Sequence, residues 1–214
     1  MTLGPQWSPA MVLGETTASL TGLTEEDPMS PVIYSLNVSL DGFIAGPGGD
    51  ISWGAPDAEQ FDVHVEQTRD IAVHLCGRGV YEAMLVWETA EQTMTGEAEL
   101  EFARIWCAIP KVVFSRTLTS VEGNARLATG DVATEVRRLR DQYDEGVVAI
   151  AGAGLAAQAI ASDLIDEYRQ FVNPIVLGGG TPYFAPVAGP LDLRLTETRT
   201  FDTGVVYLRH ERVR

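Results

Sequence analysis

Basic residues are scarce in this chain of 214 residues. There are 15 Lys+Arg against 30 Asp+Glu, which gives a formal net charge of -15 at pH 7. A surface of that charge repels phosphate backbones and anionic lipid headgroups, so the composition argues against a nucleic acid or a membrane as partner. If the ligand is an anion, it must bind at a few local cations, and each Arg near a strand end is therefore informative.

Cysteine is rarer still, and long hydrophobic runs are missing. Cys76 and Cys107 lie in apolar surroundings, and neither has a partner at C-x-x-C spacing. This argues against a disulfide framework and against a zinc site, and a reducing cytoplasm fits it best. No apolar run reaches the roughly 18 to 20 residues that span a bilayer. The first 28 residues also lack a basic region followed by an apolar core, so they do not form a secretory signal.

Several catalytic signatures are absent as well. The three histidines, His64, His74 and His210, lie outside any nucleophile motif. The zinc-deaminase pattern of H-x-E with P-C-x-x-C does not occur, and no Walker lysine follows the glycines. Hydride transfer asks little of a protein beyond orientation and electrostatics, so it suits a site poor in nucleophiles.

The most informative stretch that is present runs over residues 147–160. A β-branched strand leads through Gly152-Ala153-Gly154 into an Ala-rich helix. Such a turn leaves backbone N–H groups free at a helix N-terminus, where a phosphate is favoured, although the glycines could equally serve close packing alone. The pattern also fits the dinucleotide fingerprint of Rossmann folds. That fold expects the glycines early in the chain and an acidic residue about 20 positions later, and Asp166 and Glu167 lie nearer, so we rank it lower.

Four other predicted strands end in glycine, serine or arginine. The strand Ile71–Cys76 is followed by Gly77-Arg78-Gly79, and the strand Lys111–Phe114 by Ser115-Arg116-Thr117. A hydroxyl beside a guanidinium suits a phosphate monoester, although a solvated surface Arg would have the same sequence. The remaining two ends are Ser39 to Ala45, after the strand Val32–Val38, and Gly178 to Gly180, after the strand Glu167–Leu177.

Helices are predicted between these strands. One helix runs from Pro56-Asp57 to about Arg69, another spans Val80–Trp87, and Asp131 caps a third over Val132–Gln142. We interpret Arg137, Arg138 and Arg140 on the third helix as a solvated face. A hairpin, 191–200 with 204–210, closes the chain.

Strands that alternate with helices predict an α/β fold. Its sheet is largely parallel and covered on both faces, with an antiparallel edge from the hairpin. In such sheets ligands bind at the carboxyl ends of the strands, where all five motifs fall. We expect one domain over residues 31–214, preceded by a flexible extension over residues 1–30 that is rich in Gly, Pro, Ser and Thr.

The five motifs, in this order, resemble those of the dihydrofolate-reductase-like superfamily. They are most similar to stand-alone relatives of the reductase domain of the bacterial riboflavin-biosynthesis deaminase/reductase, and the resemblance covers about Val32 to Arg209. It implies a three-layer α/β/α fold with a mostly parallel sheet and an antiparallel C-terminal hairpin. It also implies NADPH as hydride donor, a small-molecule substrate and a homodimer.

The resemblance further assigns roles to residues. Ser115 and Arg116 would bind the adenosine 2'-phosphate, and Gly77 and Arg78 would lie beside the pyrophosphate. The full cofactor set is Ser39, Gly42, Ala45, Gly77, Arg78, Ser115, Arg116, Gly152, Ala153, Gly154, Leu155, Gly178 and Gly179, and the substrate set is Tyr34, Asn37, Trp53 and Tyr81. Asp41 would protonate or orient the substrate if an apolar pocket raised its pKa, but Asp41-Gly42 is equally typical of a turn.

The implied activity is reduction of a heterocyclic or ribosylamino-pyrimidine-type substrate by NADPH, as in 5-amino-6-(5-phosphoribosylamino)uracil reductase. Alternatives are a dihydrofolate or pteridine reductase and a non-catalytic NADP-binding protein. Two features depart from the riboflavin enzyme: the deaminase partner is missing, and no basic cluster lies near the expected nicotinamide end. A less anionic pteridine-like or pyrimidine-like substrate therefore stays open.

Overall fold

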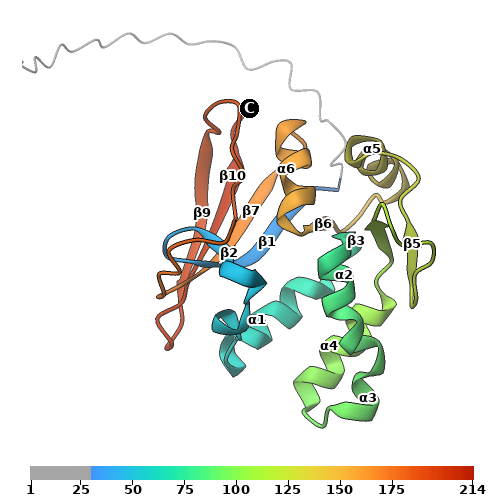
Figure 1. The fold of residues 1–214 in the computed structure, drawn as a ribbon, viewed down its shortest axis with the longest axis horizontal. Helices are drawn as coiled ribbons and strands as arrows, with labels where there is room; N and C mark the ends of the chain where they lie inside the picture. Colours follow the sequence, from blue (N-terminus) through green and yellow to red (C-terminus); the bar gives the residue numbers. More distant parts are fainter. Residues whose placement is uncertain (1–29) are drawn as a thin grey trace, which may run out of the picture.

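The structure is a computed structural model that describes residues 30–214. The extension predicted over residues 1–30 lies, apart from Ser30, outside the described residues. Strands and helices alternate along the chain as the sequence predicts (Figure 1). The elements are β1 (Val32–Ser39), β2 (Phe43–Ala45), α1 (Ala58–Arg69), β3 (Ile71–Gly77), α2 (Arg78–Met84), α3 (Ala90–Thr93), α4 (Glu97–Ala108), β4 (Lys111–Phe114), β5 (Ala125–Leu127), α5 (Val132–Gln142), β6 (Val147–Ala151), α6 (Ala153–Ala161), β7 (Glu167–Asn173), β8 (Thr181–Pro182), β9 (Leu193–Thr200) and β10 (Val206–Arg212).

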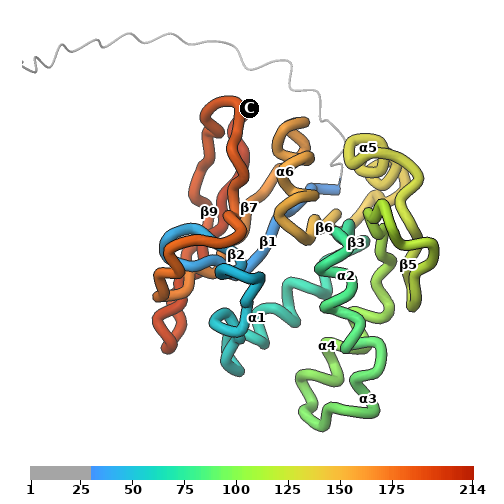
Figure 2. The backbone as a smooth tube through the Cα atoms, in the orientation of Figure 1, coloured from blue at the N-terminus to red at the C-terminus, as the bar shows by residue number. Residues whose placement is uncertain are grey.

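An eight-stranded sheet in the order β5-β4-β3-β6-β1-β7-β10-β9 forms the centre of the molecule. Its first six strands are parallel, and β10 runs antiparallel to both β7 and β9. Strands β2 and β8 pair separately, close to β1 in the backbone view (Figure 2). The predicted mostly parallel sheet with an antiparallel C-terminal hairpin is confirmed. Because six strands are parallel, their carboxyl ends share one edge.

Helices cover both faces of this sheet. Figure 1 shows α5 and α6 on one side, with α1, α2 and α4 on the other. Successive side chains of β1 point to opposite faces of the sheet, as in any β-strand. Val32, Tyr34 and Val38 join the buried cluster under α5 and α6, whereas Asn37 hydrogen-bonds to Gln60 of α1. Each face of the sheet is thus buried against its own layer of helices.

The helix caps follow the sequence closely, and two element ends do not. The side chains of Asp57 and Asp131 accept hydrogen bonds from the backbone N–H groups three residues later, at the starts of α1 and α5. The predicted strand over residues 167–177 ends at Asn173, because Pro174 has no N–H to donate to a neighbouring strand. The helix expected from Val80 begins at Arg78.

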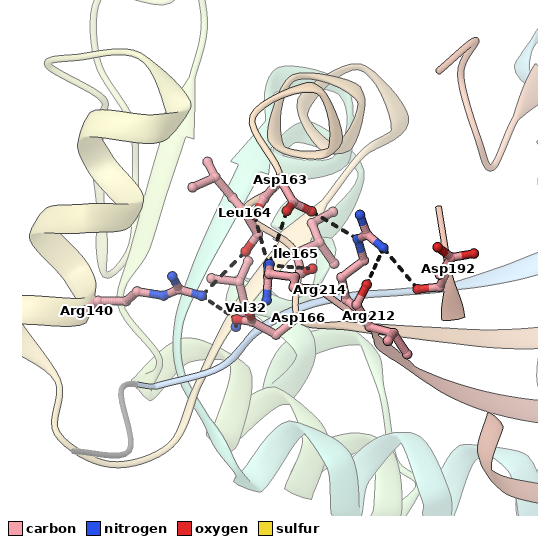
Figure 3. A network of polar contacts seen from close by, with 10 residues as sticks. Val32, Arg140, Asp163, Leu164, Ile165, Asp166, Asp192, Arg212 and Arg214 are labelled. Atoms are coloured by element: carbon pink, nitrogen blue, oxygen red, sulfur yellow. Dashed lines mark hydrogen bonds and ion pairs between the residues drawn. The ribbon is translucent and has the colours of Figure 1, made fainter. Parts of the chain in front are cut away.

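A network of polar contacts joins the amino ends of β1 and β7 to α5 and to the C-terminal residues after β10 (Figure 3). Arg140, predicted to be solvated, pairs with Asp166 and its side chain is 16% exposed, so that interpretation was wrong for this residue. The carboxylate of Asp166 also accepts a hydrogen bond from the N–H of Val32 at 2.8 Å and pairs with Arg214 at 2.8 Å. Asp166 therefore lies at the edge opposite the glycine turn, which excludes it as the ribose-binding acid of a Rossmann fold.

Candidate active site

The turn between β6 and α6 provides free backbone donors at the carboxyl edge of the sheet. Gly152 has a φ of 111°, which favours glycine, and no side chain caps the helix at this residue. The first N–H groups of α6, at Ala153 and Gly154, have no acceptor within the helix. Leu155 is different, because its side chain is buried in the core and its N–H donates to the carbonyl of Gly152 at 3.2 Å. Of the predicted cradle, residues 152–155, only residues 152–154 offer free donors, and Leu155 belongs to the core.

The ends of β3 and β4 join into one polar surface. Arg78 donates from Nη1 to Thr117 Oγ1 at 2.7 Å and from Nε to Glu82 Oε1 at 2.8 Å. Ser115 Oγ accepts hydrogen bonds from the N–H groups of Thr117 and Leu118 at 3.2 and 3.0 Å. These contacts bring together Arg78 and Ser115, as the sequence predicts.

Arg116 extends from this surface without an ionic partner. Its side chain is exposed, and no carboxylate of residues 30–214 pairs with it. Among the described residues, Arg104 on α4 and Arg137 on α5 are the other arginines with no ion pair, and neither belongs to the loops at the carboxyl edge. Arg116 is thus the cation at this edge that remains available to an anion.

A tight turn after β1 organises the opposite side of the site. Ser39 Oγ donates to Asp41 Oδ1 at 2.6 Å and accepts from the N–H of Phe43 at 2.9 Å. The carboxylate of Asp41 accepts two backbone hydrogen bonds, from Leu177 at 3.1 Å and from Gly178 at 2.7 Å. Gly42 has a φ of 88°, as a turn-forming Asp-Gly pair requires. Asp41 therefore fixes the glycine loop after β7 to the end of β1.

These contacts correct the proposed chemistry of Asp41. Its side chain is exposed, and its pKa lies below the ordinary value because the Ser39 hydroxyl and then the Leu177 and Gly178 N–H groups stabilise the carboxylate. A group that protonates substrate needs the opposite shift. The condition of a raised pKa is therefore not met, which argues against Asp41 as the proton donor, and the alternative of a turn-forming residue fits its contacts. A role in orienting the substrate stays a prediction.

The glycine loop lies close to β2. A Cβ on Gly180 would collide with the carbonyl oxygen of Ala45, whereas nothing lies within 4 Å of one on Gly179. The pairing of Ala45 with Thr181 holds this close approach in place. Gly178, Gly179 and Ala45 are thus brought together with the Asp41 turn, as predicted.

A cavity of about 290 Å³ lies between the sheet and helices α1, α2 and α4. Its walls are mostly apolar, and aromatic side chains form much of the lining. The cavity reaches Ala151, the last residue of β6, so it ends beside the Gly152 turn. The lining includes Asn37, Phe61, His64, His74, Trp87, Phe102, Trp106 and Arg169.

Two of the four predicted substrate residues lie in this region. Asn37 lines the cavity, where its Oδ1 accepts from Gln60 Nε2 at 2.8 Å. Trp53 lines a neighbouring pocket of about 440 Å³ together with Gln60 and Asn173. The carbonyl of Gly54 accepts from Asn37 Nδ2 at 3.1 Å and connects the two.

The structure does not bring Tyr34 and Tyr81 to the site. Tyr34 is fully buried and stacks on Tyr183 with ring centroids 4.3 Å apart, on the α5 and α6 side of the sheet. The alternation of β1 places it on the face opposite Asn37. Tyr81 is buried under α4, and its hydroxyl accepts from the N–H of Glu122 at 2.6 Å. Both tyrosines serve the core.

Sequence reasoning missed His64 and Arg169. His64 packs on Phe171 at 4.3 Å between centroids, and burial lowers its pKa to about 4, so the imidazole is neutral at pH 7. Arg169 lies on β7 with a side chain that is 9% exposed, and its Nε pairs with Glu167. No motif surrounds either residue. A charged residue at an inward position of a central strand was the available signal, because arginine is rarely buried without a reason.

Within residues 30–214, no group of three or more His, Cys, Asp or Glu residues is placed to hold a metal ion. None of the helices described there has the length and apolar character to cross a membrane.

Comparisons with known proteins agree with this architecture. The model of the RibD C-terminal domain family matches residues 31–207. YyaP, an uncharacterized protein of Bacillus subtilis (strain 168), is 31% identical over 179 residues, which cover 83% of this chain and 92% of that protein.

Solved structures with the same fold include a protein of Shewanella sp. PV-4 assigned to riboflavin biosynthesis. It has a TM-score of 0.69 at 22% identity and covers 87% of this chain and 100% of its own. The diaminohydroxyphosphoribosylaminopyrimidine deaminase/5-amino-6-(5-phosphoribosylamino)uracil reductase of Thermotoga maritima has a TM-score of 0.62 at 18% identity, over 86% of this chain and 57% of that longer one. Dihydrofolate reductase of Enterococcus faecalis, solved with NADP(H), has a TM-score of 0.55 at 15% identity, over 86% and 97%. The fold is therefore dihydrofolate-reductase-like.

Proposed function

The chain belongs to the RibD C-terminal domain family, and on this premise we propose that it is an NADPH-dependent reductase of a heterocyclic substrate. The family consists of reductases, which supports an oxidoreductase. The observation that carries the cofactor is Arg116, the unpaired cation beside Ser115 and Arg78. A guanidinium next to a hydroxyl suits the 2'-phosphate that distinguishes NADPH from NADH.

The other residues of the carboxyl edge fit the rest of this cofactor. The uncapped N-terminus of α6 offers backbone donors for a pyrophosphate, and the Gly152 turn leaves room for it to approach. The nicotinamide would lie near Asp41 and the loop at Gly178, which these hydrogen bonds hold to the end of β1. When bound, NADPH supplies a hydride to the carbon of a C=N or C=O bond.

The balancing proton needs a source, and the cavity narrows the choice. Among the described residues, no carboxylate lines the cavity, and its histidines, His64 and His74, have pKa values that burial lowers to about 4 and about 3. Neither imidazole is in the protonated imidazolium form at pH 7, so in this proposal water supplies the proton to the substrate nitrogen or oxygen.

The class of substrate is part of the same proposal. The T. maritima relative is named for reduction of a ribosylamino-pyrimidine, which supports a pyrimidine or a related ring here. A homodimer and a cytoplasmic location complete the proposal; the absence of paired cysteines supports a reducing compartment.

The cofactor half is tested by titrating the protein with NADPH and NADH. We expect NADPH to bind in the micromolar range, and Arg116→Ala to weaken it by about 10- to 100-fold with little effect on NADH. Arg104→Ala, which removes another unpaired arginine from α4, is the matched control and leaves both affinities unchanged. NADPH that fails to bind below the millimolar range contradicts the proposal.

A non-catalytic NADP-binding protein is the second candidate, and the cavity without a protonated donor favours it. NADPH binding without oxidation across pyrimidine, pteridine and dihydrofolate substrates would establish it. Turnover of dihydrofolate with inhibition by antifolates would instead identify a dihydrofolate reductase.

A further inference from the structure

Arg169 has an unusual position in the cavity wall. It lies in the middle of β7, its side chain is 9% exposed, and it borders both the cavity and a polar pocket near Arg209. Nε donates to Glu167 Oε1, but neither Nη atom has a hydrogen-bond acceptor among residues 30–214. A guanidinium carries five donors, and the Nη atoms of Arg169 are not among the buried side-chain atoms that lack a partner in the described chain, so they reach solvent. These donors are therefore available to an acceptor on a ligand in the cavity.

The charge around Arg169 is already balanced. Glu167 pairs with Arg169 and also with Arg209, at 2.5 Å, and Arg209 lies 3.9 Å from Glu197. Two arginines thus face two glutamates, and the same pocket adds Arg199, Glu66 and Asp70, so the cluster has no excess of positive charge. Such a cluster can donate hydrogen bonds to a ligand, but it provides no excess positive charge to neutralise a phosphate dianion.

The remaining surroundings also fail to provide for a phosphate. Arg169 is the sole Lys or Arg in the described lining of the cavity, and the aromatic rings of Phe61, Trp87 and Phe102 form the walls. The neighbouring pocket at Trp53, through which a longer substrate would extend, has no Lys or Arg in its described lining and includes Asp57. A phosphate in either place would lose its hydration without gaining a counter-ion.

We propose that Arg169 determines substrate specificity: it donates hydrogen bonds to a neutral carbonyl oxygen of a flat ring, and the cavity selects rings that carry no phosphate. This inference rests on the proposed reductase function and narrows it to uncharged carbonyl-bearing heterocycles such as pyrimidinediones. A cavity of about 290 Å³ accommodates one or two rings of this kind, which can stack on its aromatic side chains. Asn37 of β1 lies on the same face of the sheet as Arg169 and supplies a second polar group at the cavity wall.

The test uses two probes that differ by one phosphate: 5-amino-6-(5-phosphoribosylamino)uracil and its dephosphorylated form. Binding of each to the full-length protein is followed by fluorescence of Trp87 and Trp106, which line the cavity. We expect the dephosphorylated probe to bind at least about 10-fold more tightly, because the phosphate has no counter-ion. Equal or tighter binding of the phosphorylated probe overturns the proposal, and so does failure of both probes to bind.

The role of Arg169 is tested by Arg169→Lys, which keeps the charge opposite Glu167 but removes the guanidinium fork. We expect this variant to bind the dephosphorylated probe about 10-fold more weakly and to keep its affinity for NADPH. Arg209→Lys is the matched control, because Arg209 shares Glu167 but does not line the cavity. If Arg169→Lys unfolds in urea at a lower concentration, Arg169→Gln combined with Glu167→Gln keeps the cluster neutral and must show the same loss. Equal effects of the Arg169 and Arg209 variants overturn the assignment, whereas loss of NADPH binding in the unmodified protein contradicts the proposed function instead.

Discussion

At the scale of single residues, Asp41 determines how the two sides of the proposed nicotinamide site are joined. Its carboxylate accepts hydrogen bonds from the Leu177 and Gly178 N–H groups, which have no other acceptor among residues 30–214. We expect Asp41→Ala to weaken NADPH binding by about 10-fold. Asp41→Asn retains one acceptor oxygen and should weaken the binding less. Fluorescence titration of the three proteins measures this. If Asp41 were instead the proton donor, both variants would abolish turnover while NADPH affinity stayed constant.

His74 predicts a loss of stability in mild acid. The ring packs on Trp106 at 4.9 Å between centroids, neither ring nitrogen has a hydrogen-bond partner in the described chain, and burial lowers its pKa from 6.5 to about 3. The unfolded chain takes up the proton near the ordinary value, and the folded chain does not. Stability is therefore complete above the ordinary pKa and falls as the pH decreases toward 3.

One histidine with such a lowered pKa decreases the free energy of unfolding by about 2 kcal/mol between about pH 7 and about pH 5. Between these pH values the free energy of unfolding of His74→Phe should decrease by about 2 kcal/mol less than that of wild type. Urea titrations of both proteins at both pH values measure this difference. His64, whose pKa burial lowers to about 4, stays in the variant and continues to contribute a similar loss. An equal decrease in both proteins would mean that His74 is already protonated, or solvated, when folded.

The sequence predicted some of these residues and not others, for a physical reason. The positions of Arg116 and Gly152 at the carboxyl edge were predictable, because each lies just after a parallel strand that the sequence pattern predicts. Tyr34 was not, because a strand pattern shows that residues alternate but not which face borders a cavity. Arg169 was missed because its environment depends on Glu167 and Arg209, and Arg209 comes from a strand 42 residues later than Glu167.

At the scale of elements, the short β2 and β8 pair holds the glycine loop against the end of β1. A Cβ at Gly180 would strike the Ala45 carbonyl, and its φ of 129° is unfavourable for other residues. We expect Gly180→Ala to lower the free energy of unfolding by about 1–3 kcal/mol in urea. Gly179→Ala is the matched control one residue away, with open space at its Cβ and no positive φ, and should change stability little. Equal stability of the two variants would show that β8 separates from β2 without cost.

The arrangement of elements was largely predictable, and the cavity was not. Parallel strands place their carboxyl ends at one edge, so the convergence of the five motifs follows from strand order alone. The cavity requires α1 and α4 to pack side by side over the sheet. Long-range packing of helices, which local patterns do not encode, created this part of the site.

At the scale of the whole molecule, the net charge of -15 affects how an anionic cofactor arrives. If NADPH is the cofactor, as proposed, the long-range field repels it, whereas Arg116 and Arg78 would attract it once it is within contact distance. Salt screens the first effect strongly, because the Debye length shortens to about 10 Å at 0.1 M. Charges that touch their ligand are screened less. The two stages of binding should therefore respond differently to ionic strength.

We expect the association rate constant for NADPH to rise by about 2- to 10-fold between low and physiological ionic strength, because repulsion controls the encounter. The dissociation rate constant should change less, since it depends on the contacts at Arg116. Stopped-flow fluorescence at several salt concentrations separates the two. Arg116→Ala should accelerate dissociation and keep the same salt dependence of association, because it alters one contact in a molecule with 30 acidic residues. An association rate that falls with salt would mean that the arginines at the carboxyl edge dominate the field that the cofactor encounters, despite the charge of the whole chain.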